Sequence, residues 1–154
     1  MADTIRDISL SSKKAFRLDG DDSRIIYLDT SDMNIIVRLE ETYPEIRKLA
    51  VEATEKLASV SKADEENDTD LTEIANVLKD IDARMRDKVD YVFASKISDK
   101  CAPDNNMFDP VDGEFRFEYI IGTLVNLYAN NLSVEFDKMK ERVKKHTAKY
   151  TKKK

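Results

Sequence analysis

Residues 29–60, DTSDMNIIVRLEETYPEIRKLAVEATEKLASV, decide the fold predicted for this chain of 154 residues. Their apolar residues recur at steps of three and four, which places them on one face of a helix. The recurring positions are Ile35, Ile36, Leu39, Tyr43, Ile46, Leu49, Ala50, Ala53, Leu57 and Val60. Such a face is buried either against another part of the chain or against a partner protein. The segment therefore predicts a helical protein and leaves open what covers this helix.

Short polar side chains precede this helix, and a proline lies inside it. The Thr-Ser-Asp sequence of residues 30–32 offers three oxygen-bearing side chains that can accept the free N–H groups of a helix N-terminus. Pro44 lacks a backbone N–H and clashes with the preceding turn of a helix. We therefore expect a short helix over residues 32–42, a kink, and a longer helix over residues 44–61.

The flanking sequence predicts a β-hairpin and further helices. Residues 15–29 place alternating apolar residues on both sides of the turn sequence DGDD, as in a hairpin. Apolar residues at helical spacing predict helices over 70–97, 114–130 and 132–147, separated by a polar link over 61–69, a loop over 98–113 and the pair Asn130–Asn131. The short polar link makes the first two long helices antiparallel neighbours. The predicted fold class is mainly α, a bundle of three to five helices with an N-terminal β-hairpin.

Length and charge predict one domain with two electrostatically different parts. A chain of this length is typical of a single domain. Its expected parts are a loose arm over 1–12, the hairpin over 15–29, a helical body over 32–147 and a basic tail over 148–154. Residues 138–154 contain nine Lys or Arg and one acid, a net charge of +8, whereas the other 137 residues contain 17 Lys or Arg and 30 Asp or Glu, a net charge of −13. An acidic body thus carries a basic C-terminal end.

The sequence predicts no catalytic, cofactor-binding or metal-binding residues, and therefore a protein that is not an enzyme. Cys101 is the only cysteine and His146 the only histidine, and apart from Lys100 beside Cys101 no neighbouring residue in the sequence would activate either one. Acidic residues do gather in the loop, but their spacing differs from that of an EF-hand calcium loop. They are Asp99, Asp104, Asp109, Asp112 and Glu114. No phosphate-binding loop or nucleophile motif is present.

The basic end raises a nucleic-acid hypothesis, which we rank third. Its lysines and arginines can neutralise phosphates, but the acidic body would repel a duplex, and Tyr150 is essentially the only aromatic residue there for stacking on bases. No stretch approaches the roughly 18 apolar residues of a membrane helix. The first residues, MADTIRDISL, lack the pattern of a signal peptide, so we expect a cytoplasmic protein.

Several phrases of the sequence resemble small proteins from the tail modules of long-tailed phages and prophages of Gram-positive bacteria, in particular tail assembly chaperones. The phrases are FRLDGDDSRIIYLDTSDMNIIVRLEETYP (Phe16–Pro44), CAPDNNMFDP (Cys101–Pro110), GEFRFEYIIGTLVNLYANN (Gly113–Asn131) and VKKHTAKY (Val143–Tyr150). The resemblance covers most of the chain. It implies a protein of the bacterial host cytoplasm that binds newly made tape measure or tail tube protein, keeps it soluble, and is absent from the finished virion.

Two alternatives to a chaperone stay open at this point. A structural tail or connector subunit would remain in the virion, joined to its neighbours through the edge of the hairpin. A nucleic-acid-binding accessory protein is the third reading, and association of the chain with further copies of itself is open in each case. The resemblance supplies no binding motif at the level of residues. Exposed apolar side chains are candidates for partner binding, and we expect them at Ile36, Val37, Tyr43, Met107 and Phe108.

Overall fold

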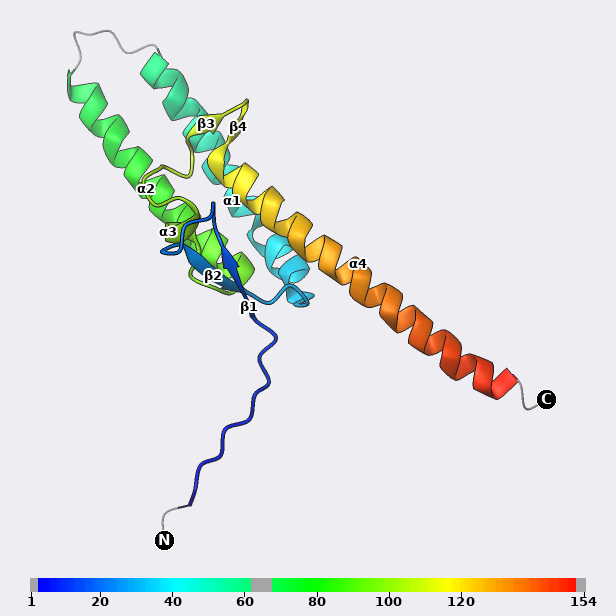
Figure 1. Ribbon diagram of the computed structural model, residues 1–154. Coiled ribbons are helices and arrows are strands. Elements are labelled where there is room, and N and C mark those ends of the chain that lie inside the picture. The colour runs from blue at the N-terminus through cyan, green and yellow to red at the C-terminus, as the bar shows by residue number, and fades with distance from the viewer. Residues whose placement is uncertain (1–2, 62–67, 152–154) are drawn as a thin grey trace.

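A computed structural model, which describes residues 3–61 and 68–151, confirms the predicted fold class: the chain is mainly helical and carries an N-terminal antiparallel hairpin. The elements in chain order are β1 (Lys14–Arg17), β2 (Ile25–Leu28), α1 (Asn34–Ser61), α2 (Asp68–Phe93), α3 (Ser98–Cys101), β3 (Pro110–Val111), β4 (Glu114–Phe115) and α4 (Arg116–Thr151). Helices α1 and α2 lie side by side, and α4 crosses α1 and then extends beyond the other elements (Figure 1). Residues 3–12, the expected loose arm, contain neither helix nor strand, and their side chains are exposed.

The β1–β2 hairpin packs one face on the helices. Phe16 pairs with Ile26 across the two strands. The turn between the strands includes Gly20 at a φ of 70°, a backbone conformation that glycine adopts without steric cost. Ile26 and Leu28 are buried in the core. This burial supplies the support that an isolated two-stranded hairpin lacks.

Two basic side chains join the hairpin to α3 in both directions. The Nε atom of Arg24 donates to the carbonyl of Lys100 at 2.7 Å, and Arg24 Nη2 donates to the carbonyl of Cys101 at 3.3 Å. In return, Lys100 Nζ donates to the carbonyl of Ile25 at 2.9 Å. Because these bonds satisfy carbonyl groups that the strands and the short helix leave free, they fix the hairpin against the rest of the molecule.

Helix α1 runs through Pro44 without interruption, so the expected division into helices over 32–42 and 44–61 is wrong. A proline inside a helix costs about 3 kcal/mol, largely through one lost hydrogen bond and a local clash. Ile35 before the proline and Leu49 after it are both buried in the same core. Burying several such side chains outweighs that cost. At the start of α1, Asp32 Oδ1 accepts the N–H of Asn34 at 2.9 Å, as expected for one of the three candidate caps.

Helices α1 and α2 are antiparallel, as predicted. Contacts between their side chains join rising residue numbers in α1 to falling numbers in α2. The pairs are Glu41 with Tyr91 (2.6 Å), Glu45 with Lys88 (2.7 Å) and Glu52 with Arg84 (3.8 Å). Most of the predicted link over 61–69 lies outside the described residues. The apolar stripe of α1 thus has its main partner within the chain.

Helix α4 is one continuous helix of 36 residues, so the break expected at Asn130–Asn131 is wrong. Asparagine in a helix costs only a few tenths of a kcal/mol relative to alanine, which is too little to end a helix that continues on both sides. Only the first half of α4 contributes to the core. Its buried residues are Phe117, Ile120, Leu124 and Tyr128. After Leu132, every described side chain of α4 is exposed.

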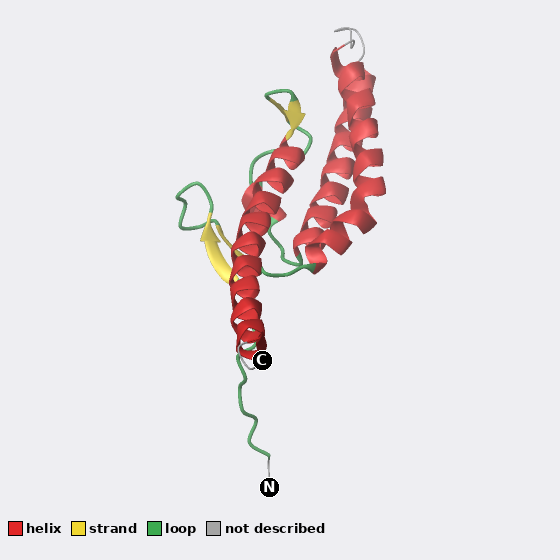
Figure 2. Cartoon of the chain, turned by 90° about the vertical axis from the view of Figure 1, so that its right-hand side faces the viewer, coloured by secondary structure: helices red, strands yellow, loops and turns green. Residues whose placement is uncertain are grey.

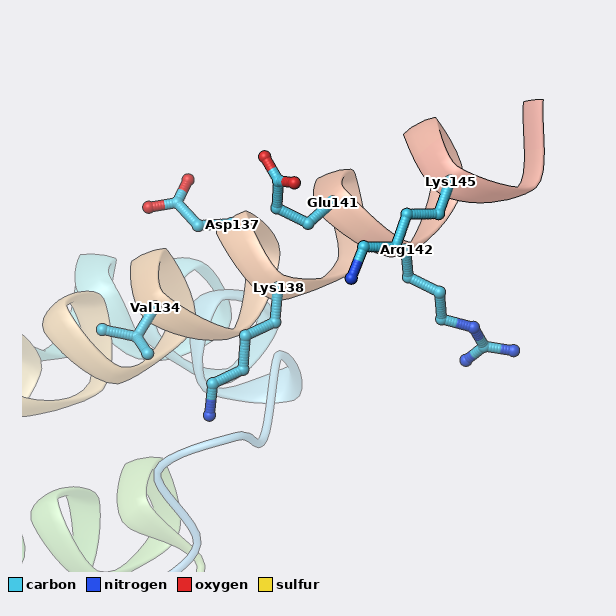
Figure 3. A pocket seen from close by; sticks show the side chains of 6 residues that line it. All are labelled: Val134, Asp137, Lys138, Glu141, Arg142 and Lys145. Carbon is cyan, nitrogen blue, oxygen red and sulfur yellow. The ribbon is translucent and has the colours of Figure 1, made fainter. Parts of the chain in front are cut away.

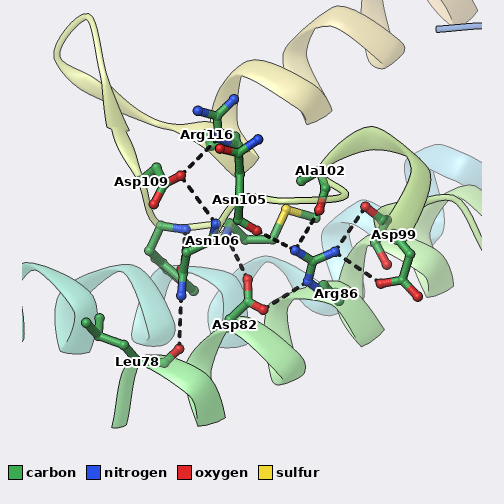
Figure 4. A network of polar contacts seen from close by, with 12 residues as sticks. Leu78, Asp82, Arg86, Asp99, Ala102, Asn105, Asn106, Asp109 and Arg116 are labelled. Carbon is green, nitrogen blue, oxygen red and sulfur yellow. Dashed lines mark hydrogen bonds and ion pairs between the residues drawn. The ribbon is translucent and has the colours of Figure 1, made fainter. Parts of the chain in front are cut away.

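The guanidinium of Arg86 on α2 organises the segment between α2 and α4 (Figure 4). It uses all five of its N–H groups. The acceptors are Asp82 Oδ2 (2.9 Å), Asp99 Oδ1 (3.1 Å) and the carbonyls of Ser98 (3.2 Å), Ala102 (2.8 Å) and Asn105 (2.6 Å). The predicted loop over 98–113 is therefore fastened along α2 and also forms α3 and β3.

The same network positions the start of α4. Asp82 Oδ1 accepts the N–H of Met107 at 2.7 Å. Two N–H groups at the N-terminus of α4 then donate to carbonyls of the loop: Arg116 to Asp109 and Phe117 to Met107, both at 2.8 Å. These N–H groups have no acceptor within their own helix. The loop thus replaces the missing helical partners and sets the point from which α4 leaves the body.

Replacing Arg86 tests how much stability this network contributes. Arg86→Met removes one donor from each of two carboxylates, Asp82 and Asp99, and from three loop carbonyls, so we expect a loss of at least about 3 kcal/mol in the free energy of unfolding. Arg84→Met is the matched control, because Arg84 lies on the same helix, is more exposed, and its ion pairs with Asp80 and Glu52 are longer, at 3.4 and 3.8 Å. Urea titration followed by circular dichroism measures both, and equal losses would contradict the assigned role.

Two neighbouring isoleucines test which face of α1 belongs to the core. Ile35 is buried and Ile36 is exposed. Ile35→Asp places an uncompensated charge in the core and should lower the free energy of unfolding by more than about 3 kcal/mol. Ile36→Asp should change it by less than about 1 kcal/mol. Thermal unfolding curves of the two variants measure the difference. A wild-type melting temperature for Ile35→Asp would show that the face of α1 that carries Ile35 is not part of the core.

Candidate functional site

An open groove lies between α1 and the first half of α4. Its volume is about 860 Å³. It is lined from α1 by Leu39, Glu40, Tyr43, Pro44, Ile46, Arg47 and Ala50, and from α4 by Phe117, Glu118, Ile121 and Gly122. We call this feature the α1–α4 groove.

The α1–α4 groove has an apolar floor and a charged rim. Leu39 and Ile121 are half-buried and pack against the core, so they form part of the floor. Tyr43 is 61% exposed and lies at the edge, with Glu40 and Arg47 one turn away on either side. An apolar trough with acidic and basic groups along its edge suits an amphipathic helix or a short apolar segment of another protein.

Two residues that disfavour helices lie in the walls of the groove. Gly122 occupies α4, and a methyl group added at its Cα would meet no atom within 4 Å, so the missing side chain leaves open space. Pro44 occupies α1 and has no N–H, so the carbonyl of Glu40 lacks its usual helical donor. The groove therefore has a smooth wall on one side and a backbone acceptor near the other.

Three of the predicted partner-binding residues lie on the exposed side of α1. Ile36, Val37 and Tyr43 are all exposed, and Tyr43 lines the groove. Ile36 precedes Tyr43 by about two helical turns on the same face, so it extends the apolar edge beyond the groove. Val37 is turned by about 100° from Ile36 around the helix axis and does not line the groove.

The exposure expected for Met107 and Phe108 is wrong. Their exposed fractions are 0% and 2%. The Met107 N–H is held by Asp82, and the Phe108 ring packs edge-on against Phe115 and Phe117 with ring centroids 5.5 and 5.1 Å apart. The network around Arg86 folds this loop inward, which a count of apolar residues in the loop does not reveal. These two residues belong to the core and cannot contact a partner.

The α4 side of the groove is absent from the sequence predictions, which place Ile121 and Gly122 simply within the helix over 114–130. One signal is present in the sequence. Gly122 interrupts an otherwise apolar helical segment, and a glycine in such a place points to a packing or functional reason.

Outside the groove, the candidate reactive cysteine is largely buried, and two of the candidate metal-binding acids form ion pairs. Burial raises the pKa of the Cys101 thiol to about 11, so the thiol stays protonated and weakly nucleophilic at neutral pH. Among the loop acids, Asp99 pairs with Arg86 and Asp109 with Arg116. Within residues 3–61 and 68–151, no three His, Cys, Asp or Glu side chains are grouped to hold a metal ion. The side chain of His146 lies outside the described part of the chain.

None of the helices within the described residues is both long enough and apolar enough to cross a membrane. No protein-family model matches the chain, and no curated protein or solved structure matches it either. A function is therefore inferred from the groove, the exposed surfaces and the phrases of sequence quoted above.

Gly122→Ala tests whether this glycine serves the groove or the fold. Alanine stabilises a helix by about 0.5–1 kcal/mol relative to glycine, and the added methyl group meets no neighbour. We expect the melting temperature to rise by about 1–4 °C, which differential scanning calorimetry measures. A destabilised variant would mean that the backbone at Gly122 is tighter than the structure indicates.

Proposed function

We propose that this protein is a non-enzymatic tail assembly chaperone of a long-tailed phage or prophage of Gram-positive bacteria. It binds tape measure or tail tube protein in the cytoplasm of the bacterial host before assembly. The observation that carries the proposal is the α1–α4 groove, an open apolar trough on a small helical protein. The resemblance of the sequence phrases to this class of protein supplies the identity of the client.

The groove suits a client that exposes apolar helices. A tape measure protein is a long helical chain, and before assembly its apolar faces are available for aggregation. A client helix laid in the groove covers its apolar face with Leu39 and Ile121, while Glu40 and Arg47 meet polar groups at its edge. Tyr43 combines a large apolar ring with a hydroxyl group, a combination enriched among residues that dominate binding energy.

Substitutions in the groove test the proposal through client binding. Tape measure and tail tube proteins from the same phage or prophage are co-expressed with this protein, and co-purification and client solubility are measured. Tyr43→Asp and Gly122→Gln introduce a charge and a bulky polar side chain into the groove, so each should reduce co-purification by roughly tenfold or more. Leu71→Asp is the matched control, because Leu71 is an exposed apolar residue of α2 outside the groove.

Loss of client with the control variant and retention with the groove variants would contradict the groove as the binding site. Mass spectrometry of purified virions separates the proposal from the structural alternative. A chaperone is absent from virions, whereas a tail or connector subunit is present in stoichiometric amounts. DNA binding that weakens steeply with salt would favour the nucleic-acid alternative instead.

A further inference from the structure

The second half of α4 extends away from the body (Figures 1 and 2). Large apolar side chains are exposed along it. Phe136 and Met139 are 41% and 56% exposed, and together with Lys140, Val143 and Lys144 they line a shallow hollow on the helix surface. Large apolar side chains that cluster on a projecting helix mark a contact surface.

An apolar stripe along this part of α4 has the spacing of a coiled-coil seam. Its residues are Leu132, Phe136, Met139 and Val143, which follow one another at steps of four, three and four. These steps are the a and d positions of a heptad repeat, which keep one seam facing a partner helix. Towards the N-terminus of α4, the next a and d positions of the same heptad register are Ala129, Val125 and Gly122. Gly122 lines the α1–α4 groove. We call residues 132–143 at these positions the α4 stripe.

The other side of this part of α4 is polar. It carries the charged side chains Asp137, Lys138, Glu141, Arg142 and Lys145, with Val134 as the one apolar member of the group (Figure 3). In Figure 3 the two acids point away from one side of the helix, and Lys138 and Arg142 point away from another. The helix is therefore amphipathic where it has left the body, and only the α4 stripe suits an apolar partner.

We infer that the α4 stripe binds the α4 stripe of a second copy of this chain in the antiparallel orientation. An antiparallel seam pairs a positions of one helix with d positions of the other. With the twofold axis between residues 137 and 138, Phe136 faces Met139 of the second copy, and Leu132 faces Val143 of the second copy. Each of these layers occurs twice by symmetry, so one surface serves as both halves of the contact.

Net charge favours the antiparallel orientation over the parallel one. Residues 138–154 carry a net charge of +8, and a parallel pair would place two such segments next to each other. In the antiparallel pair the basic segments point in opposite directions. Each then runs back towards the acidic body of the other copy, whose net charge is −13. Attraction between opposite charges replaces repulsion between like charges.

One pair of flanking residues adds specific complementarity. Glu135 and Arg142 both occupy g positions, which face each other across an antiparallel seam. Glu135 of each copy therefore meets Arg142 of the other, which gives two ion pairs. Within a single chain, the Glu135 carboxylate forms an ion pair with the exposed Lys138 at 3.6 Å, and an exposed pair of this kind is weak.

Sedimentation velocity of the full chain tests for this dimer. We expect a concentration-dependent dimer, and the double variant Phe136→Glu/Met139→Glu should weaken dimerisation by at least about tenfold. Val134→Glu is the matched control, because Val134 is apolar, 53% exposed and on the opposite side of the same helix. Circular dichroism checks that each variant keeps its helices. A wild-type chain that stays monomeric up to millimolar concentration overturns the inference.

Charge reversal and crosslinking test the orientation. Glu135→Arg and Arg142→Glu should each weaken the dimer, and the double reversal should restore it to within a few-fold of the wild type. When Phe136→Cys and Met139→Cys chains are mixed and oxidised, crosslinks should form mainly between the two different chains, while the half-buried Cys101 stays unmodified. Crosslinks that form mainly between two Phe136→Cys chains would indicate a parallel pair and overturn the inference.

The exposed N-terminal arm provides a last distinction. Ile5 and Ile8 are also exposed apolar residues, and an arm exchanged between copies would produce a dimer by another route. Ile5→Asp/Ile8→Asp should leave the dimer unchanged if α4 forms the contact. A dimer that is lost with this arm variant but kept with Phe136→Glu/Met139→Glu overturns the inference.

Discussion

The five hydrogen bonds that Arg86 donates hold the segment between α2 and α4 against α2. A guanidinium at this place satisfies three loop carbonyls and two carboxylates at once, which a lysine with its three donors cannot do. The loop that it fastens then supplies acceptors for the first N–H groups of α4 and brings Phe108 under Phe115 and Phe117. The anchored loop thus fixes the start of α4, the helix that forms one wall of the α1–α4 groove.

Arginines repeat this function at two other junctions of the molecule. Arg24 holds the hairpin to α3, and Arg38 on α1 donates to the carbonyl of Val92 at 2.8 Å and to Asp32 at 2.6 Å. Each side chain is largely buried and reaches backbone groups that no helix or strand satisfies. The chain thus uses arginine side chains, in addition to its apolar core, to fix the connections between its elements.

Sequence reasoning succeeds where the signal is local and fails where tertiary packing decides. The periodicity of residues 29–60 and 70–97 predicts two long helices, and the short polar link between them predicts that they are antiparallel, because both signals are local in the sequence. Sequence reasoning does not predict that α1 continues through Pro44. The proline costs about 3 kcal/mol locally, and the burial of side chains that outweighs this cost is visible only in the folded structure. Sequence reasoning misplaces Met107 and Phe108 for the same reason: the N–H of Met107 donates to the carboxylate of Asp82, 25 residues earlier, and the loop packs inward there. Sequence reasoning also misses the α4 side of the groove, because no local pattern in the sequence indicates which face of α4 lies beside α1.

The groove and the α4 stripe lie on one continuous face of α4. Glu118, Gly122, Val125, Ala129 and then the α4 stripe occupy successive seam positions of a single heptad register. Beside the first half of this face α1 forms the second wall of a groove, and where α1 no longer reaches, the same face is open to another copy (Figure 1). A client helix that extends past the groove would meet the second copy on this face. Client binding and self-association would then oppose each other, and thermodynamic linkage requires that each weaken the other by the same factor.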